Sequence, residues 1–279
     1  MTYRLGGSGQ VRSMLYVPAH RPEMVAKTVR WRPDIVVVDL EDAVPVAEKE
    51  SARHLAVDAI DRLEAAAGTT VMLRIHPVGS PWFREDVATA VRCRVGVVLP
   101  KLERVAELDE LRRLLTDGGL ADAPVCGGIE TGRGVADARE LLASGVTSCY
   151  FGAEDLIGDL GGRRTDAGHE VLYARSAVLL AARLADIPAI DQAVVAVRDD
   201  DRFMADATTG RELGYQGKIC VHPRQVELAH QVFSPSPEEI EYARAVLAAG
   251  ETGAAVLDGR MIDEVHLRQA RTTLARAGA

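Results

Sequence analysis

Charged residues follow several short apolar runs along this chain, and their placement limits the folds that it can adopt. Six of them lie at or near the end of such a run: Glu41, Asp42, Arg74, Lys101, Glu130 and Asp155. A charge beside a buried strand is costly unless it has a role there. Because the strands of a parallel barrel all end on one side, charges after several strands can converge on one site. The sequence therefore predicts a parallel α/β barrel with functional groups at its carboxyl end.

Strand candidates recur at fairly regular intervals. There are eight of them: residues 12–18, 34–40, 70–76, 95–100, 124–130, 147–152, 187–192 and 217–223. Segments with helical periodicity lie between them, as in AELDELRRLL, where Leu108, Leu111 and Leu115 fall on one face. Eight strands alternating with helices predict the α/β class and a (β/α)8 TIM barrel. A doubly wound open sheet is the alternative, but no GxGxxG motif follows the first strand.

The pattern changes after the eighth unit. SPSPEE is typical of a helix start, with Ser236 as N-cap and Glu239 three residues later, and the helix should run to about Ala249. A glycine-rich stretch then leads to a last helix with the pattern MIDEVHLRQARTTLARA. We therefore expect a barrel over residues 1–233 and a helical extension over residues 234–279, which forms a lid or packs on a neighbouring subunit.

Composition excludes some classes of function. The net charge of -8, with both signs interspersed, argues against nucleic acid as a partner. The first residues contain no apolar signal region and no run approaches 18 apolar residues, so we expect a cytoplasmic protein that does not enter the membrane. The four cysteines lie far apart without metal-ligand spacing, which favours core thiols in a reducing compartment: Cys93, Cys126, Cys149 and Cys220.

Two carboxylates follow neighbouring strands. Glu130 and Asp155 lie at the ends of the fifth and sixth strand candidates, and adjacent strands lie about 4.8 Å apart. Two carboxylates that approach one another in this way, together with waters and substrate oxygens, are a usual way to hold Mg²⁺. The alternative is that Glu130 caps a helix or pairs with Arg133, and that Asp155 is a helix N-cap.

A second acidic pair, Glu41 and Asp42, follows the second strand candidate, and Lys49 and Arg53 lie one helical turn apart just beyond it. One interpretation is an internal salt-bridge network near the barrel rim. The other is a supporting role, in which the pair hydrogen-bonds the waters of a metal or orients a cation such as Lys101.

Arg74 lies inside a strand candidate that is otherwise made of Val, Met, Leu and Ile. A guanidinium group there needs a partner, and it suits a carboxylate or an enolate oxygen. His76 and His222 also stand at strand ends. Histidines at such positions are often only hydrogen-bonded rim groups, so they are weaker candidates for function.

Eight sequence blocks together resemble a known family. Over residues 12 to about 275, the chain is similar to the citrate lyase β-subunit-like proteins of the HpcH/HpaI aldolase family, whose close relatives include malyl-CoA and citramalyl-CoA lyases. The blocks occur in the family's order: SMLYVPAHRPEM, VVVDLEDAVPVAEKESAR, LRIHPVGSPWF, VVLPKLE, GGIETGRGV, FGAEDL, KICVHPRQV and GRMID. The residue after RI is His76, where Asn is frequent in relatives.

The resemblance implies a TIM barrel that uses Mg²⁺ and assembles as a homotrimer or hexamer. It implies that Glu130 and Asp155 bind Mg²⁺, that Asp42 supports the waters of the metal, and that Arg74 contacts the thioester or oxo-acid oxygen. Glu130 would thereby also help to hold the substrate.

Three further residues take roles only through the resemblance. Arg21 and Lys27 match positions that hold the phosphates of coenzyme A. Asp263, in GRMID, matches an acid that completes the site of a neighbouring subunit.

The reaction implied is a reversible retro-Claisen cleavage of a 3-hydroxyacyl-CoA thioester into an acyl-CoA and a 2-oxo acid. Arg74 would stabilise the enolate oxygen, and Asp263 of the next subunit would protonate its carbon. Three alternatives remain open: a malyl-CoA thioesterase or malate-synthase-like activity at the same site, a citrate lyase subunit that depends on a carrier protein, and an aldolase acting on free 2-oxo acids.

Overall fold

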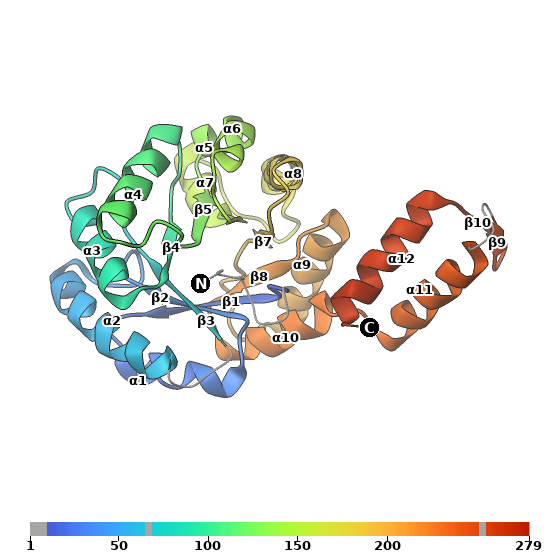
Figure 1. The fold of residues 1–279 in the computed structure, drawn as a ribbon, viewed down its shortest axis with the longest axis horizontal. Helices are drawn as coiled ribbons and strands as arrows, with labels where there is room; N and C mark the ends of the chain where they lie inside the picture. Colours follow the sequence, from blue (N-terminus) through green and yellow to red (C-terminus); the bar gives the residue numbers. More distant parts are fainter. Residues whose placement is uncertain (1–9, 65–68, 251–254, 279) are drawn as a thin grey trace. The chain divides into compact units, whose positions relative to one another are not determined.

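Eight parallel strands form a closed barrel in a computed structural model that describes residues 10–64, 69–250 and 255–278 (Figure 1). Their order around the barrel is their order in the sequence. The strands are β1 (Ser13–Pro18), β2 (Ile35–Asp39), β3 (Thr70–Arg74), β4 (Gly96–Leu99), β5 (Val125–Ile129), β6 (Ser148–Phe151), β7 (Ala189–Asp191) and β8 (Gly217–Cys220). All eight predicted strands are present, each slightly shorter than expected, and the predicted (β/α)8 fold class is confirmed.

Helices follow the strands and surround the barrel. They are α1 (Pro22–Val25), α2 (Lys49–Glu64), α3 (Phe83–Cys93), α4 (Val105–Asp117), α5 (Gly132–Ala136), α6 (Ala138–Ala143), α7 (Ala153–Leu160), α8 (His169–Leu184), α9 (Asp200–Leu213) and α10 (Pro223–Phe233). In α4 the predicted stripe of Leu108, Leu111 and Leu115 is buried. No described helix has both the length and the apolar character that crossing a membrane requires.

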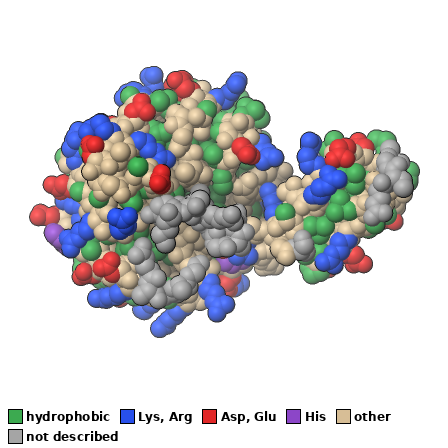
Figure 2. Space-filling view, in the orientation of Figure 1, with side chains coloured by type: hydrophobic (Ala, Val, Ile, Leu, Met, Phe, Trp, Pro, Cys, Tyr) green, Lys and Arg blue, Asp and Glu red, His purple; other side chains and the backbone are tan. Residues whose placement is uncertain are grey.

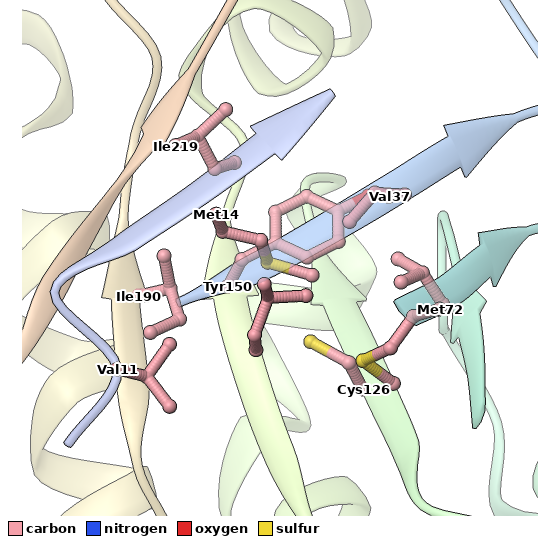
Figure 3. Close-up of a cluster of buried hydrophobic side chains, with 10 residues drawn as sticks. Val11, Met14, Val37, Met72, Cys126, Tyr150, Ile190 and Ile219 are labelled. Atoms are coloured by element: carbon pink, nitrogen blue, oxygen red, sulfur yellow. The ribbon is translucent and has the colours of Figure 1, made fainter. Parts of the chain in front are cut away.

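Apolar side chains from every strand fill the barrel interior. They form one buried cluster (Figure 3): Val11, Met14, Ile35, Val37, Met72, Val98, Cys126, Tyr150, Ile190 and Ile219. Burying one large apolar side chain contributes roughly 1.5–3 kcal/mol before other terms, so this cluster is a main source of barrel stability. All four cysteines are free and buried, as predicted. On the outside, Lys and Arg are interspersed with Asp and Glu over the visible face of the barrel unit (Figure 2).

The chain divides into two compact units, the first ending at His230 and the second beginning at Gln231. The second unit contains α11 (Pro237–Ala249), the hairpin strands β9 (Ala255–Leu257) and β10 (Arg260–Ile262), and α12 (Glu264–Ala277). The predicted N-terminus of α11 is confirmed. The Ser236 hydroxyl accepts the N–H of Glu239, and the Glu239 carboxylate accepts the N–H of Ser236.

The prediction that the last helix begins near Met261 is wrong. Met261 and Ile262 pair with β9, and α12 begins only after its N-cap, Asp263. The chain reverses at Asp258 and Gly259, whose φ angles are 50° and 75°. An Asp-Gly pair with two positive φ angles is the preferred two-residue hairpin turn, so the local sequence contained this signal.

Candidate active site

Arg74 ends β3 beside Asp39, the last residue of β2, because the parallel register pairs these positions. The guanidinium donates from Nε to Asp39 Oδ1 at 2.7 Å and from Nη2 to Oδ2 at 2.5 Å. Nη1 lies 2.9 Å from Glu41 Oε2. A bidentate pair of this kind fixes the plane of the guanidinium group. The predicted need of Arg74 for a partner is therefore met by two carboxylates, of which the sequence analysis did not identify Asp39.

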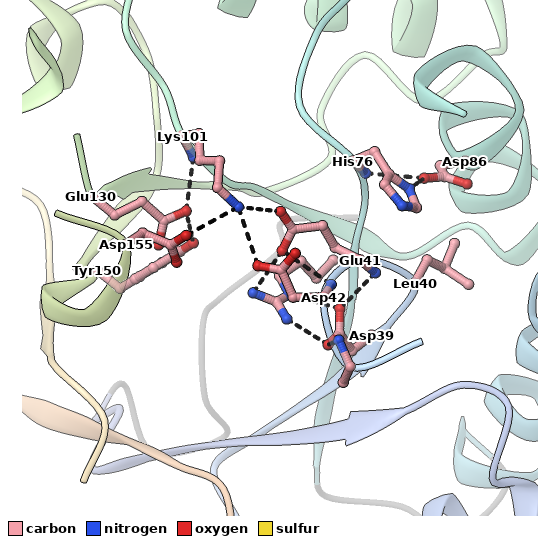
Figure 4. A network of polar contacts seen from close by, with 12 residues as sticks. Asp39, Leu40, Glu41, Asp42, His76, Asp86, Lys101, Glu130, Tyr150 and Asp155 are labelled. Carbon is pink, nitrogen blue, oxygen red and sulfur yellow. Dashed lines mark hydrogen bonds and ion pairs between the residues drawn. The ribbon is translucent and has the colours of Figure 1, made fainter. Parts of the chain in front are cut away.

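Lys101 brings the second strand end together with the sixth. Its ammonium nitrogen lies 2.5 Å from Glu41 Oε1, 3.2 Å from Asp42 Oδ2 and 3.4 Å from Asp155 Oδ1 (Figure 4). Burial alone would lower the pKa of Lys101, but the hydrogen bond and charge of Glu41, with the other carboxylates, raise it well above its ordinary value. Glu41 and Asp42 thus both contact Lys101, an arrangement that fits either predicted role, a salt-bridge network at the rim or the orientation of this cation.

The backbone of Lys101 is also unusual, since its φ is 51°. The left-handed conformation costs a residue with a side chain roughly 1–2 kcal/mol and is found preferentially at functional sites. In this conformation the N–H of Lys101 donates to Glu130 Oε1 at 2.9 Å, while its side chain reaches Glu41. One residue thus links two acidic groups of the rim.

Glu130 follows β5 and is almost completely buried. Its Oε1 also accepts the hydroxyl of Tyr150, at 2.8 Å. Burial, followed by the charge of Asp155, raises the pKa of Glu130 to about 7, although Lys101 and the Tyr150 hydrogen bond oppose the rise. The chain can come this close only because residue 152 is glycine: a Cβ on Gly152 would lie 2.5 Å from the Cβ of Glu130.

Asp155 lies in the first turn of α7, whose N-cap is Gly152, and its side chain is 36% exposed. The alternative interpretations of the two acids are therefore wrong. Asp155 is not the N-cap, and Arg133 lies 3.6 Å from Asp137 rather than pairing with Glu130. Thr131, not Glu130, caps α5.

The rim has more negative than positive charge. Two cations, Arg74 and Lys101, are in contact with a larger set of carboxylates: Asp39, Glu41, Asp42, Glu130 and Asp155. Such an excess suits a divalent cation. In the part of the chain that the structure describes, no group of three or more His, Cys, Asp or Glu side chains is arranged to hold a metal. Two carboxylates with waters and substrate oxygens is the ligand set that Mg²⁺ commonly takes.

A cavity of about 250 Å³ opens beside these groups. One part of its wall is polar and comprises Asp39, Arg74, Glu130, Asp155 and the two tyrosines Tyr16 and Tyr150. The other part is largely apolar and comprises Val17, Pro18, Ala153, Ala193, Ile219 and Val221. The volume suits a small organic acid with a short apolar substituent. The tyrosines were not predicted as site residues, since nothing in their local sequence distinguishes them from core aromatics.

The wall of this cavity does not include Glu41, Asp42 or Lys101, which contact one another, and four further predicted residues are also absent from it. Arg21 is the N-cap of α1, Lys27 precedes a 3-10 turn, and both side chains are exposed, with no ion-pair partner among the residues described. Asp263 lies in the second unit, where its Oδ1 accepts the N–H groups of Val265 and His266. His222 is exposed, and its ring nitrogen Nδ1 accepts the N–H of Arg224. Asp263 therefore has a structural task within its own chain, as the cap of α12.

Comparison with known proteins agrees with the resemblance seen in the sequence. Residues 12–223 match the family described as "HpcH/HpaI aldolase/citrate lyase". A citrate lyase subunit beta-like protein of Deinococcus radiodurans is 46% identical over 275 residues, which cover 95% of this chain and 96% of that protein. A (3S)-malyl-CoA thioesterase of Cereibacter sphaeroides is 33% identical over 276 residues, covering 96% of this chain and 95% of that protein.

Solved structures give the same result. The CitE protein of Mycobacterium tuberculosis, in complex with magnesium, acetoacetate and coenzyme A, superposes with a TM-score of 0.84. It is 32% identical, and the alignment covers 98% of this chain and all of that one.

Proposed function

The chain belongs to the HpcH/HpaI aldolase/citrate lyase family, and we propose that it is a Mg²⁺-dependent carbon–carbon lyase. It cleaves, or forms, a 3-hydroxyacyl-CoA thioester of the malyl, citramalyl or citryl type, with an acyl-CoA and a 2-oxo acid as products. The observation that carries this proposal is the pair Glu130 and Asp155, which lies in an excess of negative charge beside a cavity that Arg74 also lines.

Glu130 and Asp155 are the residues that would hold Mg²⁺. The metal supplies Lewis-acid polarisation of the oxygens of the oxo-acid portion. The rise in the pKa of Glu130 reflects burial beside a second negative charge, and a divalent cation would relieve that repulsion. Asp42, with its exposed carboxylate beside Lys101, supports waters of the metal.

Arg74 stabilises the enolate oxygen of the acyl thioester. Three of its five N–H groups are engaged with Asp39 and Glu41, which leaves one on each terminal nitrogen for a substrate. Because the guanidinium is already clamped, little reorganisation is needed as charge develops on the oxygen. Lys101 orients the carboxylates. Its raised pKa favours the protonated form at neutral pH, which fits a positioning cation better than a Schiff-base nucleophile.

The remaining parts of the substrate site come from residues away from the cavity. Arg21 and Lys27 hold phosphates of coenzyme A. In a cytoplasmic homotrimer or hexamer, Asp263 of a neighbouring subunit protonates the enolate carbon. The hydrogen bond from the His266 side chain lowers the pKa of Asp263, so this carboxylate begins ionised. It takes up the proton that the substrate hydroxyl loses as the carbon–carbon bond breaks, and then delivers it to the enolate carbon.

The replacement Asp263→Asn tests this assignment. Asn caps a helix about as well as Asp, so the stability of α12 should be retained while the proton donor is lost. We expect kcat to fall roughly 100-fold or more, in the range of general acid–base effects, with little change in the thermal midpoint. An unchanged kcat would show that Asp263 serves only as a helix cap.

A thioesterase activity at the same site is the second candidate, favoured by the similarity to a (3S)-malyl-CoA thioesterase. In that case water attacks the thioester carbonyl, and Arg74 stabilises the oxyanion formed there. The similarity to a citrate lyase subunit beta-like protein supports a third candidate, in which the thioester is carried by an acyl carrier protein.

Mass spectrometry of the products separates these activities. The protein is incubated with (S)-malyl-, citramalyl- and citryl-CoA, with Mg²⁺ and with EDTA. A new acyl-CoA and a 2-oxo acid, formed only with Mg²⁺, would support the lyase. Free coenzyme A with the intact hydroxy acid would identify a thioesterase. Absence of any product would contradict both and leave the carrier-bound thioester as the substrate to test.

A further inference from the structure

A second polar group lies behind the rim, on the outer side of the loop that follows β2. His76 Nδ1 lies 2.5 Å from Asp86 Oδ2, and the backbone N–H of His76 donates to the same oxygen at 3.0 Å (Figure 4). The other ring nitrogen, Nε2, lies 2.6 Å from the ammonium nitrogen of Lys49. An ammonium group can only donate, so Nε2 accepts from Lys49 and Nδ1 donates to Asp86.

Lys49 uses its remaining hydrogens on the main chain of the β2 loop. Its ammonium donates to the carbonyl oxygen of Glu41 at 2.9 Å and to that of Leu40 at 3.4 Å. All three of its N–H groups therefore have a partner, and Lys49 is buried. A buried polar network in which every donor and acceptor is hydrogen-bonded holds the surrounding main chain in one conformation.

Aromatic packing closes the same group. The ring centroids of Trp82 and His76 lie 4.8 Å apart. The ammonium nitrogen of Lys49 lies over the Trp82 ring, 5.0 Å from its centroid. Asp86 is buried as well, and its second oxygen accepts from Arg53. We refer to Lys49, His76 and Asp86 as the β2-loop clamp.

The loop is also held from its inner side. The carboxylate of Asp39 accepts the N–H of Glu41 at 2.9 Å and that of Ala43 at 3.3 Å. Lys49 of the clamp thus holds the carbonyl groups of Leu40 and Glu41. Asp39 holds the N–H groups of Glu41 and Ala43. Glu41 and Asp42 therefore belong to a loop whose main chain is hydrogen-bonded on both sides. The carboxylates of both residues contact the ammonium group of Lys101.

Lys101 completes the path to the cavity, since its backbone donates to Glu130 and its ammonium lies beside Asp155. On the premise of the Mg²⁺ site above, we propose that the β2-loop clamp consists of positioning residues. Lys49, His76 and Asp86 touch neither substrate nor metal. They fix Glu41 and Asp42, and through Lys101 they fix the two metal-binding carboxylates.

The test is the replacement Lys49→Met, which keeps the length of the side chain and removes its donors. Removing an outer partner of a metal site typically costs 10- to 100-fold in metal affinity or activity. We therefore expect the Kd for Mg²⁺, measured by calorimetry on the full chain, to rise roughly 10-fold. We expect kcat to fall 10- to 100-fold, with KM for the thioester nearly unchanged because Arg21 and Lys27 are unaffected. Lys49→Arg, which retains charge and donors, should recover part of both losses.

Lys218→Met is the matched control. Lys218 is likewise a buried lysine, but its ammonium contacts Asp191 and Asp206 rather than the β2 loop. The Lys218→Met replacement should lower the thermal midpoint and leave the Kd for Mg²⁺ unchanged. His76→Phe, which keeps a ring against Trp82, provides a second variant if Lys49→Met does not fold.

The outcomes separate the two proposals. If the folded Lys49→Met and His76→Phe variants bind Mg²⁺ and turn over like the wild type, the clamp is only structural and the inference is wrong. If the wild-type chain binds Mg²⁺ but cleaves no thioester, the proposed function fails, while the Mg²⁺ affinities still decide the role of the clamp.

Discussion

Two buried charged networks in the barrel unit differ in their balance of charge. The first, which we call the outer network, lies between β7, β8 and the helices α8 and α9. Lys218 contacts Asp191 at 2.7 Å and also pairs with Asp206. Arg175 donates to Asp191 at 2.8 Å and lies 3.2 Å from Asp206. Two cations thus meet two anions, and the outer network is neutral.

The position of the outer network follows from strand alternation. Ile190 and Ile219 belong to the cluster inside the barrel, so their neighbours Asp191 and Lys218 face outward, towards the helices. The charges are compensated by one another and by the hydrogen bond from Gln192 to Asp206. Such a network holds helices on a barrel, and its charges are balanced even though Arg175 and Asp206 also line a cavity.

The second network, which we call the rim network, is not balanced in charge. It consists of Arg74 and Lys101 with the carboxylates at the carboxyl end of the barrel: Asp39, Glu41, Asp42, Glu130 and Asp155. Five carboxylates share two cations, and the group borders a cavity. Repulsion within a partly buried group of this kind is relieved either by protonation, as the raised pKa values of Glu41 and Glu130 reflect, or by a bound cation. The comparison therefore teaches that burial and ion pairing do not distinguish a site from a structural network, whereas charge balance does.

The largest expected effect is that of Glu130→Gln at the rim. Removing a metal ligand removes several kcal/mol of transition-state stabilisation, which corresponds to roughly a 1000-fold loss of kcat/KM. The stability of the protein without metal should be unchanged or higher, because a buried charge has been removed beside Asp155. Turnover with Mg²⁺ and the thermal midpoint in EDTA measure the two effects. A strong loss of stability in EDTA would mean that the rim is as structural as the outer network.

The outer network should show the reverse behaviour in Lys218→Met. Breaking a buried pair typically costs about 3–5 kcal/mol in the free energy of unfolding, since Asp191 and Asp206 would then share only Arg175. Denaturant titration measures this loss, and kcat per folded molecule should stay within a factor of two to three of the wild type. If activity fell as far as in Glu130→Gln, the two networks would be coupled.

Replacements of Lys101 can separate the effect of its charge on activity from the effect of its backbone conformation on stability. Both Lys101→Ala and Lys101→Gly remove the ammonium and should lower kcat roughly 10- to 100-fold. Glycine tolerates the positive φ, so the glycine variant should be more stable than the alanine variant by about 1 kcal/mol. Equal stabilities in a denaturant titration would show that the left-handed backbone at this position carries no cost.

The smallest effect concerns pH. Because the pKa of Glu130 is raised to about 7, protons compete with Mg²⁺ below that pH, and the Kd for Mg²⁺ should rise by up to tenfold per pH unit as the pH falls from 7. The charges of the outer network should stay constant between pH 6 and pH 8. Lys218 and Arg175 outweigh the effect of burial and lower the pKa of Asp206, so this carboxylate remains ionised over that range. Calorimetry between pH 6 and pH 8 is the measurement. A constant Kd would remove Glu130 from the set of ligands.

Much of the fold and part of the site could be predicted from local sequence. The eight strands, the buried stripe of α4 and the start of α11 follow from periodicity and capping signals, which depend on near neighbours in the chain. The Asp258-Gly259 turn was also encoded locally, although the apolar pattern around Met261 predicted a helix there. Asp39 was not predicted as a site residue because it is one of several acids at the end of the same strand.

The sequence by itself determined that charges follow several strands, and a parallel barrel necessarily ends its strands on one side. Glu130, Asp155 and Lys101 therefore had to meet. Only the tertiary structure decided which partner each charge takes. Register joins Arg74 to Asp39, and the packing of α2 and α3 joins Lys49 to His76 and His76 to Asp86. Charge balance depends on distances between residues far apart in the chain, because Coulomb energy follows separation in space rather than in sequence.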